Sequence, residues 1–308
     1  MTILITPKIN PDLDGVACAL AYADFLNNTD KANIYVAGIY GQPHVEARFL
    51  LEKFNIKDGL IFDPKIEFDK YIIVDASDIK GMPEIIKSQD VIEVIDHRQM
   101  HRAEELFPNA KIQIESVGAA ATLIFEKMRE VNFPINSDSL YLLLGAIFSN
   151  TLNFKSDIAT ERDLKAVESL SRDYGVVIPP NLIEDMFRHK TEYIANNLEE
   201  VIASDFKTFD GGLGIAQLEG FDLQNLIGDK IENIKEVLKK IKEKHNLEYI
   251  FLTAADIKNG YNIFVAIDEK TQSLLSQSID LSFDDQGTAK NDKLLLRKQL
   301  LPLLIKSL

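Results

Sequence analysis

Four side chains that can bind divalent metal ions follow short apolar runs in the first third of the chain. Asp12 and Asp14 come soon after the run at residues 3–6. Asp75 ends the run YIIVD, and His97 ends the run VIEVIDH. Hard carboxylate oxygens with one imidazole suit Mn²⁺, Co²⁺ or Mg²⁺ better than a structural zinc site. A divalent ion there would lower the pKa of a bound water and offset charge on a phosphoryl group, so these residues predict phosphoesterase chemistry.

Each of these aspartates taken alone has a simpler explanation. Asp is common in turns and at helix N-caps, and the motif Asp12-Leu13-Asp14-Gly15 stands directly before a helical pattern. For this motif by itself, capping remains the better explanation. Acidic residues at three strand ends of one parallel sheet, one of them Asp96 joined to His97, are much harder to explain as turns.

The elements that would position these residues alternate along the first half of the chain. Short apolar runs of the kind buried in parallel sheets alternate with helical patterns. The expected strands are 3–6, 33–37, 71–74, 91–95 and 112–115, and the first expected helices are 15–26 and 44–54. This order predicts an α/β fold with a doubly wound parallel sheet, which binds ligands beyond the carboxyl ends of its strands.

The length of 308 residues is about twice that of a usual domain and predicts two domains. We place an N-terminal domain with the metal site at residues 1–190, a linker or hinge at 191–204, and a smaller C-terminal α/β domain at 205–308. The second domain opens with a predicted hairpin, in which Asp-Gly-Gly joins strands at 206–209 and 213–218.

Composition excludes several classes of protein. The net charge of −14 argues against a nucleic-acid binder, which normally presents a basic face to phosphates. The single cysteine, Cys18, excludes an intrachain disulfide and a zinc-thiolate cluster. The N-terminus MTILITPK lacks the pattern of a signal peptide, and no apolar run is long enough for a membrane span, so we expect a cytoplasmic protein that is not inserted in a membrane. The other histidines have no ligand spacing and are expected at the surface or in packing: His44, His101, His189 and His245.

Motifs distributed over nearly the whole chain resemble those of one family. They are NPDLD at 10–14, CALAYADFL at 18–26, VDAS at 74–77, VIEVIDHR at 91–98, ESVGAAAT at 115–122, FSNTLNFKSDIATERD at 148–163, DFK at 205–207 and RKQ at 297–299. In order and spacing they resemble the DHH phosphoesterase superfamily. Within it, the chain is most similar to the family II, manganese-dependent inorganic pyrophosphatases.

The resemblance implies a dinuclear Mn²⁺ or Co²⁺ site in the first domain and a second domain that closes over it with basic residues. By position, Asp12, Asp14, Asp75 and His97 match metal ligands, and Asp75 would bridge the two ions. In the second domain, the matches to substrate-gripping positions are Lys207, Arg297 (normally Lys) and the adjacent Lys298. The resemblance also implies a homodimer formed through the first domain.

The chain departs from the family pattern at several functional positions. Lys8 stands where the family has a metal-binding His, Asn150 where it has a ligating Asp, and Arg98 where it has the second His of Asp-His-His. Leu296 replaces an Arg of the second domain, and Ala76 replaces a His. An ammonium cannot ligate a metal, because it has donors and no lone pair.

These departures predict an altered metal site. Where the family has four aspartates facing two divalent ions, this chain has three aspartates and one lysine, whose net charge balances one ion. We therefore predict one well-bound ion at Asp14, Asp75 and His97, with Asn150 able to offer only a neutral oxygen. Lys8 would stand where the other ion sits, paired with Asp12 and Asp75.

Arg98 points to altered substrate preference, because Arg is a strong bidentate phosphate ligand. Exopolyphosphatases of the prune type are similar in having Asp-His-Arg and in lacking the first His. Asn150 and Leu296 point instead to weakened or lost pyrophosphatase activity.

The sequence thus predicts a metal-dependent phosphoanhydride hydrolase that acts on pyrophosphate or short-chain polyphosphate. Asp14, Asp75, His97 and Arg98 would form its catalytic site, and Lys8, Arg98, Lys207, Arg297 and Lys298 would neutralise phosphate oxygens. One alternative is a catalytically silent protein that binds phosphate or a nucleotide. Another is a phosphodiesterase for short oligonucleotides, although the sequence lacks the Gly-rich substrate loop of those relatives.

Overall fold

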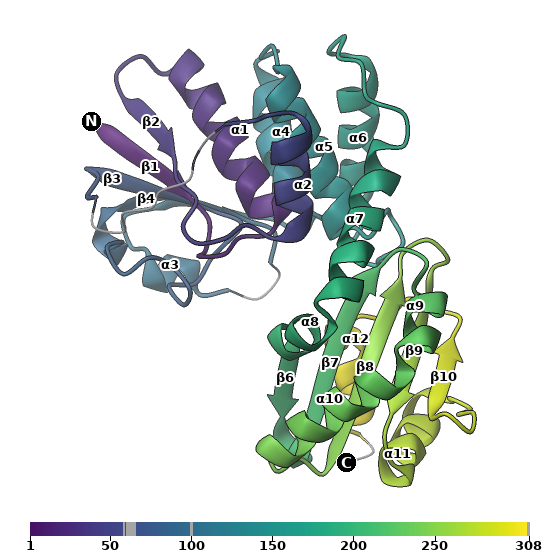
Figure 1. Ribbon diagram of the computed structural model, residues 1–308. Coiled ribbons are helices and arrows are strands. Elements are labelled where there is room, and N and C mark those ends of the chain that lie inside the picture. The colour runs from purple at the N-terminus through teal and green to yellow at the C-terminus, as the bar shows by residue number, and fades with distance from the viewer. Residues whose placement is uncertain (58, 60–65, 99–100, 307–308) are drawn as a thin grey trace. The chain divides into compact units, whose positions relative to one another are not determined.

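The computed structural model describes residues 1–57, 59, 66–98 and 101–306 (Figure 1). The chain forms two compact units, Met1–Met186 and Phe187–Leu308. No helix among the described residues is both long and apolar enough to cross a bilayer. Residues 191–204, where we predicted a linker, belong to the helices α7 (Leu182–Asn196) and α8 (Leu198–Ser204), apart from residue 197 between them.

The first unit contains a parallel sheet with the strand order β2-β1-β3-β4-β5. Its strands are β1 (Thr2–Thr6), β2 (Ile34–Ala37), β3 (Lys70–Val74), β4 (Val91–Asp96) and β5 (Lys111–Ile114). The central strands β1 and β3 are almost wholly buried, as expected for apolar runs covered on both faces. The predicted parallel sheet is confirmed.

The order of these strands reverses between β1 and β3. After β1 the chain passes to β2 on one side, and it then returns to β3 on the other side of β1. The two strands pair in parallel, with Thr6 beside Ile73, so their carboxyl ends lie at the same edge. Open α/β sheets bind ligands at such a reversal point, beyond the carboxyl ends of the strands.

Helices cover part of this sheet and pack on one another. They are α1 (Leu13–Thr29), α2 (Val45–Lys53), α3 (Ala103–Leu106), α4 (Ala120–Glu130), α5 (Ser137–Asn150), α6 (Glu161–Arg172) and the short 3₁₀ helix η1 (Ser88–Asp90). α1 packs against α4 and α5. Gly145 allows the close approach of α5, because a Cβ there would lie 2.4 Å from Cδ1 of Leu50 and 3.2 Å from Cδ2 of Leu13.

The second unit contains a mixed sheet with the order β10-β9-β8-β7-β6. Its strands are β6 (Phe206–Phe209), β7 (Leu213–Gly220), β8 (Tyr249–Asp256), β9 (Tyr261–Ala266) and β10 (Thr288–Asn291). β7 and β8 are parallel, whereas the other neighbours are antiparallel. The predicted hairpin is confirmed as β6 and β7, joined by the 3₁₀ turn η2 (Asp210–Gly212), in which Gly211 has φ 76°.

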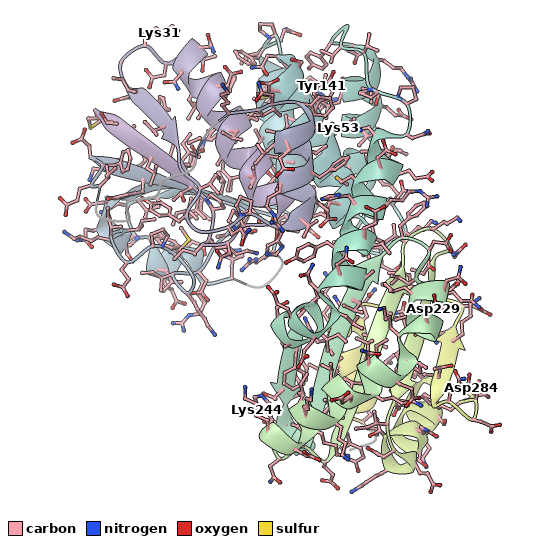
Figure 2. The ribbon with its side chains drawn as sticks, viewed as in Figure 1. Lys31, Lys53, Tyr141, Asp229, Lys244 and Asp284 are labelled. Carbon is pink, nitrogen blue, oxygen red and sulfur yellow. The ribbon has the colours of Figure 1, made fainter. Side chains whose placement is uncertain are left out.

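Both faces of this second sheet are covered by helices. Besides α7 and α8, they are α9 (Leu223–Asp229), α10 (Ile231–Lys244), α11 (Glu269–Ile279) and α12 (Arg297–Leu304). Along β8, Leu252 packs in one core with α10, and Phe251 packs in the other core with α11 and α12. Charged side chains point outward, among them Lys244 on α10 (Figure 2). The smaller C-terminal α/β unit is therefore confirmed.

Candidate metal centre

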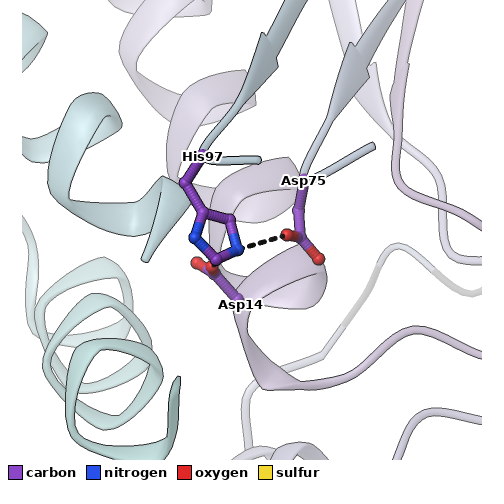
Figure 3. A group of neighbouring side chains, drawn as sticks. All are labelled: Asp14, Asp75 and His97. Carbon is purple, nitrogen blue, oxygen red and sulfur yellow. Dashed lines mark ion pairs between the residues drawn. The ribbon is translucent and has the colours of Figure 1, made fainter. Parts of the chain in front are cut away.

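Asp14, Asp75 and His97 meet at the carboxyl edge of the first sheet (Figure 3). One potential ligand atom from each lies within 4.8 Å of the other two. Nε2 of His97 is 3.6 Å from Oδ1 of Asp75 and 4.0 Å from Oδ2 of Asp14. The residues come from the first turn of α1 and from the ends of β3 and β4, so the reversal of strand order brings them together.

Asp14 is fully buried and binds the start of α4. Its oxygens accept hydrogen bonds from the backbone N–H groups of Ala120 (2.7 Å) and Ala121 (2.8 Å). Oδ2 also accepts from Nδ2 of Asn150 at 2.7 Å. Burial raises the pKa of Asp14 to about 6, and the negative charge of Asp12 adds to this effect; together they outweigh the opposing effects of His97 and of the N–H bonds. A carboxylate at a helix N-terminus is favourable, so Asp14 has a structural role whether or not an ion is bound.

Asp75 is buried without enough polar partners for a charged carboxylate. It follows β3 with φ 52°, a left-handed conformation that is uncommon outside glycine. None of the described residues hydrogen-bonds its Oδ2. Burial raises the pKa of Asp75 well above its usual range, and the negative charges of Asp12 and Asp14 add to the shift. A buried carboxylate of this kind gains most from a cation.

His97 presents one ring nitrogen to these carboxylates. Its Nδ1 is 3.1 Å from the carbonyl oxygen of Val117. Because a carbonyl oxygen only accepts, this hydrogen bond requires the proton to be on Nδ1. In the neutral ring, Nε2 would carry the lone pair on the side of Asp75 and Asp14, as a metal ligand requires. The donor set of Asp14, Asp75 and His97 therefore fits a divalent ion.

Lys8 and Asp12 form an ion pair beside this group. Nζ of Lys8 is 3.3 Å from Oδ2 of Asp12, while Oδ1 of Asp12 accepts from the N–H of Gly15 and caps α1. Burial opposes the charge of Lys8, but the carboxylates of Asp12 and Asp75 outweigh it and raise the pKa of Lys8. Burial would raise the pKa of Asp12, but Lys8, with a smaller contribution from His44, lowers it to about 2. One oxygen of Asp12 thus caps α1, and the other pairs with Lys8.

Asn150 and Arg98 have different relations to the group. Asn150 is the last residue of α5, and its amide binds Asp14 as described above. Arg98 is exposed, with Nε 3.5 Å from Oδ2 of the buried Asp96. Asn150 therefore contacts the potential metal ligand Asp14, whereas Arg98 is paired with Asp96, which is not one of the three clustered residues.

Comparison with known proteins decides the family. The model of the DHH family, N-terminal domain, matches residues 2–147, and that of the DHHA2 domain matches residues 184–307. The chain is 30% identical over 261 residues to a manganese-dependent inorganic pyrophosphatase of Methanothrix thermoacetophila, which covers 83% of this chain and 81% of that protein. The chain belongs to the DHH family.

Further relatives agree with this assignment. A probable manganese-dependent inorganic pyrophosphatase of Staphylococcus aureus is 27% identical over 305 residues, or 97% of this chain and 96% of that protein. A Methanococcus jannaschii structure provisionally assigned as a family II inorganic pyrophosphatase matches with a TM-score of 0.70 and 23% identity, covering 99% of each chain. An exopolyphosphatase-related protein from Bacteroides fragilis matches with a TM-score of 0.51 and 13% identity, covering 99% of this chain and 91% of that one. These two structures establish the fold.

The three basic residues predicted to grip substrate lie in the DHHA2 region and differ in their surroundings. Lys207 on β6 is exposed, as is Lys298 on α12. Arg297 is buried, and its guanidinium donates to the carbonyl oxygens of Asp205 (2.6 Å) and Ile215 (3.1 Å) and pairs with the Asp205 carboxylate. These contacts give Arg297 a structural role inside the DHHA2 region, and its substrate contact stays a prediction.

Replacing Arg297 should therefore destabilise the DHHA2 region. Arg297→Met removes the guanidinium that donates to two carbonyl oxygens and pairs with the Asp205 carboxylate, and we expect the free energy of unfolding to fall by about 2–4 kcal/mol. Lys298→Met, at the exposed neighbour, should change it by less than about 0.5 kcal/mol. Urea denaturation followed by circular dichroism measures both variants. Equal effects of the two would contradict the structural role.

Sequence reasoning missed the backbone groups that hold the site. The carbonyl of Val117 and the N–H groups of Ala120 and Ala121 lie in the motif ESVGAAAT, which carried the family resemblance but no assigned role. Gly118 followed by three alanines at the start of a helix was the available signal, because small residues permit close backbone approach. His44 was expected to lie at the surface or in packing. It is exposed at the start of α2, yet its charge acts on Asp12.

Metal affinity in this DHH domain should rise with pH. Because the pKa of Asp14 is raised to about 6, an ion must displace a proton below that pH. The association constant for Mn²⁺ should fall about tenfold per pH unit below 6, and more steeply if Asp75 also releases a proton. Calorimetry between pH 5 and 8 in two buffers of different ionisation enthalpy reports both the affinity and the protons released. An affinity independent of pH would show that metal binding displaces no proton from Asp14.

The same shift sets the pH dependence of the metal-free fold. A raised folded-state pKa makes the protonated Asp14 stabilising below its ordinary value of 3.8, and this contribution is lost as pH rises through about 6. Asp12 acts with the opposite sign, because its contribution is present above 3.8 and is lost as pH falls towards 2.

Proposed function

We propose that the chain is a metal-dependent hydrolase that splits pyrophosphate into two phosphates and binds one divalent ion, Mn²⁺ or in its place Co²⁺ or Mg²⁺. The ion would be held by Asp14, Asp75 and His97. The relatives at 30% and 27% identity, named as manganese-dependent inorganic pyrophosphatases, support the substrate and the metal.

The environment of Asp75 is the observation that carries this proposal. Its carboxylate is buried, has one oxygen that no described residue hydrogen-bonds, and lies 3.6 Å from Nε2 of His97. Burial makes ionisation of this carboxyl group costly, and a bound cation would offset that cost.

The preference for one ion follows from Lys8 and Asn150. Lys8 keeps its positive charge 3.3 Å from Asp12, where a second cation would be repelled. Asn150 supplies no charge, and its amide binds the Asp14 oxygen nearest to His97. Asn150 must release this bond before Oδ2 can accept an ion, which we expect to weaken binding relative to an aspartate at this position.

Each residue has a role in the proposed reaction that follows from its chemistry. When bound, the ion supplies a Lewis acid that acidifies water and offsets charge on the phosphoryl group. The hydrogen bond to Val117 fixes the ring of His97. Lys8 and Arg98 provide positive charge for phosphate oxygens, and Arg98 adds a planar guanidinium suited to bidentate binding.

Phosphate release by the purified protein tests the proposal. With Mn²⁺, Co²⁺ or Mg²⁺ present, we expect hydrolysis of pyrophosphate, and tripolyphosphate is the second substrate to assay because Arg98 favours it. The same preparations give the number of bound ions by calorimetry, expected to be one per chain. If neither substrate is hydrolysed above background with any of the three metals, the enzymatic proposal is wrong.

A catalytically silent phosphate-binding protein is the second candidate, and two contacts favour it. Lys8 already neutralises Asp12, and Asn150 already binds Asp14, so both carboxylates are satisfied without a metal. This candidate predicts that calorimetry detects binding of phosphate or a nucleotide, and that the same protein shows no hydrolysis. Measurable turnover would exclude it.

The remaining assignments rest on the sequence alone. Lys207 and Lys298 are proposed to bind substrate, which predicts a raised KM for Lys207→Ala with little change in kcat. The homodimer through the first domain stays a prediction that sedimentation velocity would check. The predicted lack of nucleic-acid binding rests on the net charge of −14.

A further inference from the structure

One short backbone segment, residues 117–121, holds two of the three proposed metal ligands. The carbonyl oxygen of Val117 accepts from Nδ1 of His97 at 3.1 Å. The N–H groups of Ala120 and Ala121 donate to the two oxygens of Asp14 at 2.7 and 2.8 Å. All three contacts use main-chain atoms. The position of this segment therefore determines which ring nitrogen of His97 faces Asp75 and how the Asp14 carboxylate is oriented.

A buried carboxylate on another helix ties down this segment. Asp163, in the first turn of α6, has no exposed surface. Its Oδ2 accepts from the N–H of Gly118 at 2.8 Å, and its Oδ1 accepts from Oγ1 of Thr122 at 2.6 Å. These two contacts fall just inside and just beyond the ends of the segment, so both of its ends are attached to one side chain.

The position of Asp163 is itself well determined. Oδ2 also accepts from the backbone N–H (2.8 Å) and the hydroxyl (2.7 Å) of Thr160, which completes the capping box at the start of α6. The fit at Gly118 is close, because a Cβ there would lie 2.6 Å from Cγ2 of Thr151 and 2.8 Å from Oδ2 of Asp163. The segment therefore has little room to shift while Asp163 is in place.

We propose that Asp163 is a positioning residue for the metal centre. Its hydrogen bonds go to Gly118, Thr122 and Thr160, so it acts on His97 and Asp14 through the segment 117–121. Outer hydrogen bonds that fix the tautomer and orientation of a ligand typically change metal affinity by about 10- to 100-fold. The metal-affinity part of this inference rests on the proposed function, whereas the control of the His97 tautomer does not.

Two isosteric variants separate positioning from general stability. Thr122→Val removes the Asp163 contact on the segment side. Thr160→Val removes the hydroxyl that donates to the same carboxylate and accepts from the Asp163 N–H on the α6 side, while the backbone N–H of residue 160 still holds Oδ2. We expect Thr122→Val to weaken Mn²⁺ binding several-fold and to shift His97 towards a mixture of tautomers. Thr160→Val should lower the melting temperature while leaving both properties as in the parent protein.

Replacement of Asp163 gives the larger effect. Asp163→Leu removes every acceptor, and we expect the Kd for Mn²⁺ to rise by about 10- to 100-fold. Asp163→Asn should recover most of the affinity, because its amide oxygen can accept from Gly118 while its NH₂ donates to the Thr122 hydroxyl. Affinities are measured by calorimetry with Mn²⁺ alone, at a temperature where circular dichroism shows each variant folded.

A metal-free measurement keeps this inference separate from the proposed function. In ¹⁵N-histidine NMR without metal, the parent should show His97 with its proton on Nδ1, and Asp163→Leu and Thr122→Val should lose that preference. If the parent binds no Mn²⁺, the proposed function fails, and the tautomer comparison alone decides the role of Asp163. Equal tautomer populations in Thr122→Val and Thr160→Val would overturn the inference, even if Asp163→Leu does not fold.

Discussion

Asp75→Asn is expected to abolish metal-dependent hydrolysis of pyrophosphate and, in the same protein without metal, to raise the melting temperature. Loss of this carboxylate removes one of three proposed ligands, so phosphate release should fall by about 10³-fold or more, the equivalent of ~4 kcal/mol in the barrier. The metal-free fold gains because a buried carboxyl group, whose ionisation burial opposes, is replaced by a neutral amide of the same size, which tolerates the left-handed backbone at φ 52°.

The pH dependence sharpens this prediction. The pKa of Asp75 is raised by burial, so its protonated form stabilises the parent at low pH, and this contribution is lost as pH rises through the raised pKa. The stability advantage of Asp75→Asn should therefore grow with pH. Asp78→Asn, at an exposed residue just beyond the same strand, is the matched control and should change neither property. An active Asp75→Asn, or one less stable than the parent at pH 8, would contradict the role assigned to Asp75.

The double variant Lys8→His and Asn150→Asp is expected to bind two Mn²⁺ ions per chain in place of one. The substitution at Lys8 exchanges a fixed positive charge for an imidazole with a lone pair, and it frees Asp12 from its ion pair. The substitution at Asn150 removes the amide that competes for Oδ2 of Asp14 and adds a negative charge. Hydrolysis of pyrophosphate should increase about tenfold or more, which corresponds to ~1.4 kcal/mol.

This gain should be accompanied by a cost in the metal-free state. An aspartate at position 150 would place a second carboxylate beside that of Asp14, and the two would repel each other. The melting temperature without metal should therefore fall, and added Mn²⁺ should restore it. Titration calorimetry and differential scanning calorimetry measure the stoichiometry and the recovery. Lys80→His with Asn153→Asp makes the same changes of residue type at neighbouring positions and should leave the stoichiometry unchanged. Two ions already bound by the parent at micromolar Mn²⁺ would show that Lys8 does not exclude the second one.

The site carboxylates also serve the fold, which explains why their simplest interpretation from sequence was capping. Asp12 does cap α1, and Asp14 receives the first N–H groups of α4. Capping and metal binding are compatible here, because an ionised carboxylate has several acceptor sites. The capping explanation was therefore correct for Asp12 without excluding its proximity to Lys8 and the metal centre.

The strands of the first sheet and the acidic residues at their ends could be predicted from the sequence. Buried parallel strands require continuous apolar runs, and such runs at residues 3–6, 71–74 and 91–95 correspond closely to β1, β3 and β4. Their polar successors had to lie at one edge, because parallel strands end on the same side. Local pattern was sufficient for these features, and the Asp-Gly-Gly turn between β6 and β7 likewise depended only on neighbouring residues.

Only the tertiary structure decided which partners these side chains have. Asp14 meets Ala120 and Asn150 across sequence separations of 106 and 136 residues, and Arg297 meets Asp205 across 92. No local pattern encodes such pairs, because they depend on strand order and on helix packing around residues such as Gly145. The sequence by itself determined that carboxylates and an imidazole share the carboxyl edge of a parallel sheet. Folding determined that the Asn150 amide donates a hydrogen bond to Asp14 and that Arg297 is buried. It also determined that Asp163 binds the segment 117–121, on which two of the proposed ligands depend.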